Sequence, residues 1–293
     1  MHFDKILFVI NKVSGSGKEN WRNLISNYFT EKNSSIEFLE LPDKPDAEKI
    51  RTRIKATKPQ LVVAVGGDGT VGLVALALKQ EKIPMAIIPA GSANGMAAEL
   101  KIPNTAEEAL NIISTGEIRS CDAIKIGDRY CLHLSDIGLN AQLIKYFSEG
   151  KLRGKLGYAR VIIKTLLRRK KIQVTIKARE EIKREAFMIV LANASKYGTG
   201  AVINPEGRIN DGLFEVVIVR QLSISQLLKM LFRPGPFNPT KIETHHASSV
   251  SISTKSRVHF QIDGEYLGKV THIEAAIEKN FVDLVLPPKA QDQ

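Results

Sequence analysis

The sequence predicts two domains, a doubly wound α/β domain followed by a mainly β sandwich domain. In the first 120 residues, short apolar strands alternate with helical patterns, which is typical of α/β folds. Residues 61–65 are wholly apolar, as expected for a parallel strand that helices cover on both faces. After Cys121, β-like runs follow one another with few helical stretches, which favours an antiparallel sandwich.

The elements of the first domain follow from the hydrophobic periodicity of residues 1–122. Each apolar run ends near glycine or a polar cluster, and a helical pattern separates it from the next run. Strands joined in this way by helices can lie parallel. Strands are expected at 5–10, 36–41, 61–65 and 85–88, and helices at 21–29, 46–57, 71–79 and 93–100.

The second domain, residues 123–293, is expected to consist mainly of short strands. Helical patterns are confined to 156–169 and 223–231, and residues 233–248, rich in proline at their start, are expected to form a loop. Strands are expected at 124–126, 130–135, 172–177, 186–192, 213–219, 249–253, 258–262 and 281–286.

Composition and length exclude several classes of protein. The 293 residues are 43% hydrophobic and 25% charged, unlike a fibrous or long disordered chain. The two cysteines, Cys121 and Cys131, exclude a disulfide framework and lack the partners of a structural zinc site. No apolar run approaches the roughly 18 residues of a membrane span, and residues 6–10 are too short a run for a signal peptide. We therefore expect a cytoplasmic protein.

Glycine-rich turns follow three of the expected parallel strands. The strand at 61–65 runs into the sequence Gly-Gly-Asp-Gly-Thr at 66–70, and similar turns lie at 11–18 and 89–95. Glycines let the backbone approach phosphate oxygens, and helix N-terminal N–H groups point at them. The carboxyl ends of parallel strands share one edge of the sheet, so the three turns converge there. Residues expected to bind nucleotide are Asn11, Ser14, Gly15, Gly66, Gly67, Asp68, Gly69, Thr70, Gly91, Ser92 and Asn94.

The motifs resemble, in order and over nearly the whole chain, those of the diacylglycerol kinase catalytic domain superfamily, which includes sphingosine kinases and bacterial lipid kinases. NAD kinases and phosphofructokinases share a motif similar to residues 66–70, and their nucleotide domain is the fold that the resemblance implies. Departures from the family pattern occur at Lys12, Gly72, Leu73, Ser92 and Gly95. The resemblance is carried by residues 11–17, 66–70, 89–97, 137–141, 152–158, 211–213 and 263–265.

The resemblance implies a lipid kinase that uses ATP and Mg²⁺. Asp68, between two glycines, would hold magnesium directly or through water. Asp263 and Glu265 flank a glycine, and one of them would accept the proton of the substrate hydroxyl as the transition state forms. Without the resemblance, residues 263–265 would be interpreted as an acidic hairpin turn.

The resemblance also implies a structural magnesium site and a lipid-binding segment. The side chain of Asp211 and the carbonyls of Arg208 and Leu213 would hold the ion, since hard cations prefer oxygen ligands. A plain hairpin turn is the alternative there. The substrate would contact Gly138, Asn140 and Gln142. Asn140 and Gln142 are neutral, although Asp136 is nearby, which favours a diacylglycerol-like alcohol over a sphingoid base.

A basic segment suggests an anionic partner surface. The formal charge of the chain is +11, and residues 151–185 contain 13 Lys or Arg and 3 Glu. Basic residues recur at helical spacing from Arg160 to Lys171, opposite apolar ones, which predicts a helix that docks on an anionic membrane. Nucleic acid is disfavoured because the segment lacks interleaved aromatic residues. A solvated helix is the plain alternative.

Three other functions remain open at this point, along with a homodimer. A sphingoid-base kinase would differ only in the lipid. An NAD kinase would share the glycine motif but has no use for a basic amphipathic helix. A nucleotide- or membrane-binding regulator without catalysis would be consistent with the departures at Gly72, Leu73 and Gly95.

Overall fold

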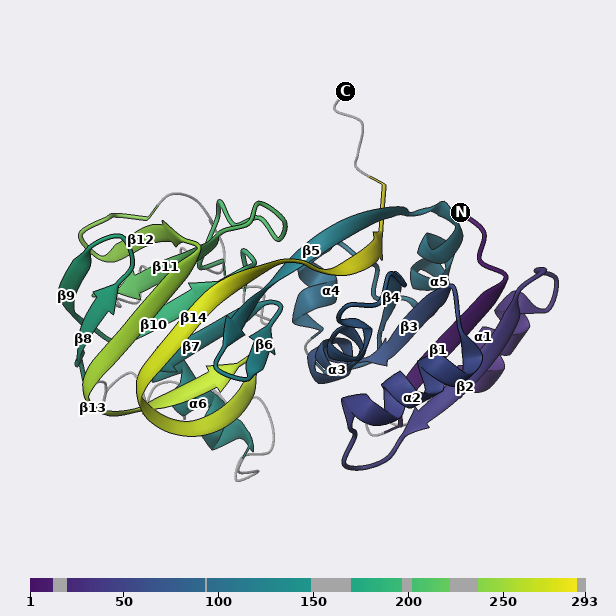
Figure 1. The fold of residues 1–293 in the computed structure, drawn as a ribbon, viewed down its shortest axis with the longest axis horizontal. Coiled ribbons are helices and arrows are strands. Elements are labelled where there is room, and N and C mark those ends of the chain that lie inside the picture. Colours follow the sequence, from purple (N-terminus) through teal and green to yellow (C-terminus); the bar gives the residue numbers. More distant parts are fainter. Residues whose placement is uncertain (13–19, 93, 149–169, 197–201, 222–236, 289–293) are drawn as a thin grey trace. The chain divides into compact units, whose positions relative to one another are not determined.

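The protein is described from a computed structural model, which covers residues 1–12, 20–92, 94–148, 170–196, 202–221 and 237–288. The helices expected at 156–169 and 223–231, and the expected nucleotide-binding residues Ser14 and Gly15, lie outside these ranges. The chain divides into two compact units (Figure 1). Unit 1 comprises Met1–Asp122 with the C-terminal segment that begins at Lys279, and unit 2 comprises Ala123–Glu278.

Unit 1 is built on a parallel sheet with the strand order β2-β1-β3-β4. Helices α2 and α3 pack against each other, as do α1 and α5. The strands are β1 (Lys5–Asn11), β2 (Ser35–Leu41), β3 (Leu61–Gly66) and β4 (Met85–Pro89). The helices are α1 (Trp21–Phe29), α2 (Ala47–Thr57), α3 (Asp68–Leu78), α4 (Gly95–Glu99) and α5 (Ala106–Thr115).

Local sequence explains why the strands and helices of unit 1 form where they do. Every residue of β3 and β4 is buried, which is the pattern of parallel strands covered on both faces. Asn20 and Asp46 cap α1 and α2 by accepting backbone N–H groups, as short polar side chains do at helix starts. β2 lies on one side of β1, and the chain then crosses to the other side of β1 to form β3, so the sheet has its switch point between β1 and β3. Ligands of open α/β sheets bind outside the carboxyl ends of strands at such a point.

Unit 2 is mainly antiparallel, with the order β12-β11-β10-β7-β13-β14. β8 pairs with β13 and β9, and β5 pairs with β6. Its core is formed by buried Ile, Val and Phe side chains such as Phe214 and Phe260. Helix α6 (Leu139–Ser148) follows β7 directly, and β5 and β14 each lie partly in unit 1. The strands that lie wholly or partly in unit 2 are β5 (Glu117–Ile126), β6 (Arg129–Cys131), β7 (Leu134–Gly138), β8 (Ile172–Lys177), β9 (Glu181–Ala186), β10 (Met188–Ala192), β11 (Phe214–Val219), β12 (Ile242–Ala247), β13 (Ser249–Ile262) and β14 (Glu265–Leu286).

Two sequence predictions are corrected by these strands. The loop expected at 233–248 contains β12, which pairs with β11. Only Ile242 and Ala247 are buried in β12, and four polar residues separate them, so no apolar alternation marks it. The C-terminal domain expected at 123–293 loses its last part to unit 1. There Leu284 of β14 pairs in parallel with Met85 of β4.

Candidate active site

The turn after β3 gives helix α3 an open N-terminus. Gly67 is the N-cap of α3, and no described side chain caps the helix. The first N–H groups of an α-helix have no partner within it, and they favour an anion placed at its end. A Cβ atom at Gly69 would meet nothing within 4 Å, so the start of α3 is uncrowded. This geometry suits the approach of a phosphate group.

Asn11 and Thr70 link the end of β1 to the first turn of α3, beside the switch point. Nδ2 of Asn11 donates a hydrogen bond to Oγ1 of Thr70 over 3.1 Å. Thr70 is only 2% exposed, so its side chain braces the turn. A Cβ atom at Gly66 would lie 2.3 Å from Oγ1 of Thr70, which explains the need for glycine there.

Asp68 ties the turn after β3 to the turn after β4. Its Oδ2 and Oδ1 atoms accept hydrogen bonds from the backbone N–H groups of Gly95 and Met96, over 2.9 and 2.8 Å. The carboxylate therefore stabilises the start of α4. Its expected contact with magnesium stays a prediction, and each oxygen retains lone pairs for it.

The turn after β4 is closed by Asn94. Its Oδ1 accepts from the Gly91 N–H over 2.8 Å, and its Nδ2 donates to the Gly91 carbonyl over 3.0 Å. Asn94 adopts a left-handed conformation with φ of 50°, which asparagine tolerates better than most residues. Ser92 beside it is exposed. The structure thus brings the described members of the expected nucleotide site to one edge of the sheet.

In unit 2, the side chain of Asp263 is held by four donors. It accepts hydrogen bonds from the backbone N–H groups of Leu132, His133 and Leu134 over 2.9, 3.0 and 3.0 Å. Sγ of Cys131 is the fourth donor, at 3.2 Å. Desolvation raises the pKa of Asp263 above its ordinary value, and His133 and the N–H donors act in the opposite direction. Asp263 therefore anchors its hairpin to the segment between β6 and β7.

Glu265, in contrast, presents its carboxylate to solvent. Its side chain is 71% exposed, and its Oε2 atom lies 3.6 Å from Nη1 of Arg129. Between the two acids, Gly264 has φ of 85° and Asp263 has φ of 46°, so the chain turns sharply. Asp263 and Glu265, which the sequence offers as alternative proton acceptors, thus have different surroundings: the carboxylate of Asp263 is held by four donors, and that of Glu265 is accessible to solvent.

A buried carboxylate that the sequence analysis did not assign lies beside this hairpin. Asp136 is 1% exposed. Its Oδ2 accepts from Nδ2 of Asn140 and Nε2 of Gln261 over 2.6 and 2.5 Å, and its Oδ1 accepts from the Ala141 N–H over 2.8 Å. Desolvation raises the pKa of Asp136 to about 6, although the three donors lower it.

The expected substrate residues lie at and after the end of β7. Gly138 has φ of 107°, and a Cβ atom there would lie 2.5 Å from the carbonyl oxygen of Phe187, so only glycine fits. The amide of Asn140 is bound to Asp136. Gln142 donates to the hydroxyl of Tyr146 over 3.0 Å, one turn along α6.

The expected magnesium residues lie on an exposed turn. Oδ1 of Asp211 accepts from the Leu213 N–H over 3.0 Å, and Arg208 is exposed. Glu215, 2% exposed, has a raised pKa because of desolvation, and the negative charge of Asp211 adds to the rise. Glu215 already accepts from the Asn204 amide and contacts His246, so Asp211 and the turn carbonyls remain as the oxygen ligands for a hard cation. Among the residues that the structure describes, however, no three His, Cys, Asp or Glu side chains form a metal-binding group.

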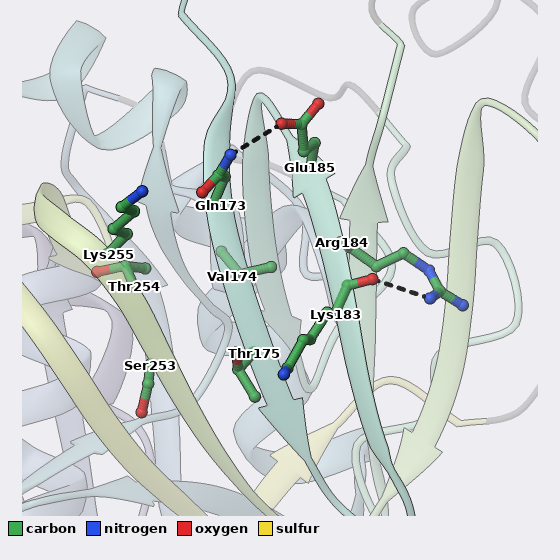
Figure 2. A pocket seen from close by; sticks show the side chains of 9 residues that line it. All are labelled: Gln173, Val174, Thr175, Lys183, Arg184, Glu185, Ser253, Thr254 and Lys255. Atoms are coloured by element: carbon green, nitrogen blue, oxygen red, sulfur yellow. Dashed lines mark hydrogen bonds between the residues drawn. The ribbon is translucent and has the colours of Figure 1, made fainter.

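A shallow hollow of about 510 Å³ lies on β8, β9 and β13, and contains none of the residues expected from the sequence. Figure 2 shows the side chains that line it, among which Gln173 and Glu185 are hydrogen-bonded to each other. Its lining residues are Gln173, Val174, Thr175, Lys183, Arg184, Glu185, Ser253, Thr254 and Lys255.

Comparison with known proteins gives two consecutive family matches. The model described as diacylglycerol kinase catalytic domain matches residues 5–126. The model described as YegS C-terminal NAD kinase beta sandwich-like domain matches residues 136–284. An Escherichia coli protein named "Probable lipid kinase YegS" is 30% identical over 79% of this chain and 80% of its own. A Staphylococcus saprophyticus protein named "Diacylglycerol kinase" is 26% identical, with 72% of both chains covered.

The fold has a solved counterpart. A crystal structure described as a diacylglycerol kinase from Bacillus anthracis matches with a TM-score of 0.78 at 20% identity, covering 98% of both chains. The matched domains and relatives define the chain as a lipid kinase. It belongs to the family of the diacylglycerol kinase catalytic domain. The expected family and fold class are thereby confirmed, and ATP use follows from the kinase family.

Proposed function

We propose that the protein transfers the terminal phosphoryl group of ATP to the hydroxyl group of an uncharged lipid alcohol, diacylglycerol or a close analogue. One observation carries the proposal most directly. The Asp68 carboxylate binds the N–H groups of Gly95 and Met96, so that the glycine turns after β3 and β4 form one backbone platform. Phosphoryl transfer depends chiefly on such positioning and on electrostatic stabilisation.

The nucleotide phosphates would lie at the start of α3 and against the turn at Gly91. Glycine at 67 and 91 leaves the backbone uncovered, and the open N-terminus of α3 offers N–H donors. Asn11, through Thr70, fixes the end of β1 beside them. Magnesium, when bound, would offset charge on the transferring phosphoryl group; Asp68 is the described residue with carboxylate oxygens on this platform. Asp211, with the carbonyls of Arg208 and Leu213, would hold a separate structural ion.

Glu265 is the proposed acceptor of the substrate proton. It is exposed, whereas Asp263 is committed to four donors. A carboxylate is too weak a base to deprotonate an alcohol in advance, so the proton would move late, as the oxygen–phosphorus bond forms. Asp263 would act by holding the hairpin that carries Glu265.

An uncharged alcohol is favoured over a sphingoid base because no free carboxylate marks the described part of the proposed lipid segment. Asp136, the acidic residue nearest to it in sequence, is buried and already accepts three N–H groups. Asn140 and Gln142 are neutral. A substrate ammonium group would find no counterion among these side chains, and leaving a charge unpaired is costly.

The basic segment 151–185 would hold the enzyme at the surface of an anionic membrane. Its described part includes exposed Lys170, Lys171, Lys177, Arg179 and Lys183. Each basic residue near such a surface contributes about 1 kcal/mol. Among the described residues, no helix is long and apolar enough to cross a membrane. Sedimentation with vesicles of neutral or anionic lipid, at low and high salt, tests this attachment.

Transfer of radiolabelled phosphate from ATP to lipids in mixed micelles tests the function. The acceptors are diacylglycerol, monoacylglycerol, sphingosine and ceramide, with NAD in a parallel reaction and with or without Mg²⁺. Label in diacylglycerol, dependent on Mg²⁺, is expected. Label in sphingosine would replace the proposed substrate class, and label in NAD would overturn the lipid acceptor. ATP binding without any labelled product would favour a regulator without catalysis.

A further inference from the structure

A chain of hydrogen bonds inside unit 2 joins the hairpin of Glu265 to the start of α6. The Gly264 N–H donates to Oε1 of Gln261 over 2.8 Å. Nε2 of Gln261 donates to Oδ2 of Asp136 over 2.5 Å. Asp136 in turn accepts from the side chain of Asn140 and from the Ala141 N–H. Both ends of the chain are segments with a proposed role in the reaction, whereas its two middle residues have none.

The two middle residues are buried and face each other across paired strands. Asp136 and Gln261 are each 1% exposed, and they are register partners in β7 and β13. On the other side of β7, the register partner of Asp136 is Val190 of β10. Buried side chains of this kind do not touch a substrate, so any effect on the reaction passes through the groups that they hold.

We propose that Asp136 and Gln261 are positioning residues, which fix the hairpin of Glu265 with respect to the lipid-binding start of α6. The proposal rests on the function proposed above and deepens it. The proton acceptor and the segment that holds the lipid hydroxyl must keep a constant separation, and a displacement of about 1 Å can cost a hundredfold in rate. A satisfied buried polar network provides such rigidity.

Each hydrogen bond between Gly264, Gln261 and Asp136 has a fixed donor and a fixed acceptor. An ionised carboxylate only accepts hydrogen bonds, so it requires the NH₂ group of Gln261. The amide oxygen of Gln261 then points to the Gly264 N–H, which requires an acceptor. The orientation of one amide is therefore dictated from both ends. A reversed amide would place its NH₂ group against the Gly264 N–H and its oxygen against the Asp136 carboxylate.

The variant Asp136→Asn creates this conflict with little change in volume. The new amide has one acceptor oxygen where the carboxylate has two. If that oxygen faces the Ala141 N–H, its NH₂ group faces the donors of Gln261 and Asn140, and a Gln261 that flips in response opposes the Gly264 N–H. If the oxygen faces Gln261 and Asn140 instead, its NH₂ group opposes the Ala141 N–H at the start of α6. The second change Gln261→Glu resolves it, because the new carboxylate accepts from both the Gly264 N–H and the amide at 136. Asn140 can then flip to offer its oxygen. The double variant thus restores the pattern of donors and acceptors, with the negative charge at position 261 in place of position 136.

Steady-state kinetics of the wild type, Asp136→Asn, Gln261→Glu and the double variant test the proposal. The acceptor is the lipid that the radiolabel assay identifies as substrate. We expect Asp136→Asn to lower kcat about 10- to 100-fold with the KM for ATP unchanged, and the double variant to recover to within about threefold of the wild type. Ser135→Ala is the matched control. It removes the buried hydrogen bond from Ser135 to the Gln261 carbonyl, leaves the amide chain intact, and should lower stability while kcat is kept.

Hydrogen exchange of the Gly264 and Ala141 amides, measured on the same proteins, separates this proposal from the proposed function. Exchange of at least one of the two amides should quicken in Asp136→Asn and slow again in the double variant. A double variant that is as slow in turnover as the single variant, or exchange that is unchanged at both amides, would overturn the positioning role. A wild type that phosphorylates no lipid would overturn the proposed function and the catalytic consequence, while the exchange cycle would still decide whether Asp136 and Gln261 hold the hairpin.

Discussion

Gly67 and Gly91 lie so close together that a Cβ atom added to Gly91 would be 2.4 Å from the Cα atom of Gly67. The contact is between the backbones of two turns, one after β3 and one after β4. Unlike a flexible side chain, neither backbone can move aside to make room for an added Cβ atom. The proposed phosphate platform therefore depends on the absence of side chains at this contact as much as on the groups that it presents.

Gly91→Ala should force the two turns apart. Overpacking of this kind costs about 1–3 kcal/mol, and ATP affinity should fall as the platform opens. Urea unfolding and equilibrium ATP binding measure the two effects. Gly72→Ala is the control, since a Cβ atom there meets nothing within 4 Å. It should raise stability by about 0.5–1 kcal/mol, because alanine favours a helix interior, and leave ATP affinity intact. Equal behaviour of the two variants would contradict the contact.

Asp68→Ala should abolish phosphoryl transfer and also destabilise unit 1. The start of α4 loses two acceptors, and loss of a helix cap costs about 0.5–2 kcal/mol. Asp46→Ala removes a comparable cap from α2 and should cost a similar amount while leaving transfer unchanged. Turnover assays and urea unfolding of both variants provide the comparison. If Asp46→Ala lost as much activity, the effect of Asp68 would be one of stability alone.

The two acids of the hairpin should respond differently to substitution. Glu265→Gln should lower kcat about 10²- to 10⁴-fold, the usual contribution of a general base, with unchanged stability because the side chain is exposed. Asp263→Asn should cost about 1–3 kcal/mol, since its NH₂ group would face N–H donors. Turnover and urea unfolding of each variant decide between them. Full activity in Glu265→Gln would transfer the role of proton acceptor to Asp263.

The pH dependence of stability should reveal Asp136. Its pKa in the folded protein is about 6, against an ordinary value of 3.8. A raised pKa means that ionisation opposes folding, so stability present below pH 3.8 is lost as the pH rises through about 6. The shift of about two units corresponds to about 3 kcal/mol.

The difference in unfolding free energy between wild type and Asp136→Asn isolates this contribution, because the variant has no carboxyl group to titrate at position 136. It should fall by about 3 kcal/mol between pH 3 and pH 7 in urea titrations. The groups that contact the carboxylate are uncharged, namely Asn140, Gln261 and the Ala141 N–H. A difference that stays constant with pH would show that these three donors offset desolvation completely.

Magnesium should raise the melting temperature of unit 2 through Asp211. A ligand that binds only the folded state stabilises it, and Asp211→Ala should remove the rise without removing ATP-dependent stabilisation. Thermal unfolding with Mg²⁺, with Ca²⁺ and with chelator measures it. An identical rise in wild type and variant would exclude the proposed structural ion at this turn.

The sequence predicts an element best where the residues of that element alone, without its partners in the fold, determine whether it forms a strand or a helix. The wholly apolar run at 61–65, followed by three glycines, predicted β3 and its turn closely. Helix α1 was predicted at its exact bounds because a polar cap precedes a clear apolar face. β12 and β9 were missed because exposed polar residues dominate them, and their partners, not their composition, make them strands.

Side-chain roles in the candidate site were harder to predict, because they depend on contacts between residues distant in sequence. Asp68 and Gly95 are 27 residues apart, and Asp263 and Leu132 are 131 apart. Gln261 stands between two apolar residues in β13, a weak sign of a buried polar group. Nothing in the sequence indicates that its partner is Asp136, since pairing of β7 with β13 establishes the contact.

The path of β14 has a consequence for how the protein is made. The strand begins at Glu265 in unit 2 and ends at Leu286 in unit 1, where Leu284, Val285 and Leu286 are buried. A ribosome delivers Met1–Asp122 long before these residues emerge. The nascent first unit therefore keeps the edge of β4 uncovered until β14 has been synthesised, and a fragment that stops at Asp122 lacks the strand that pairs with β4.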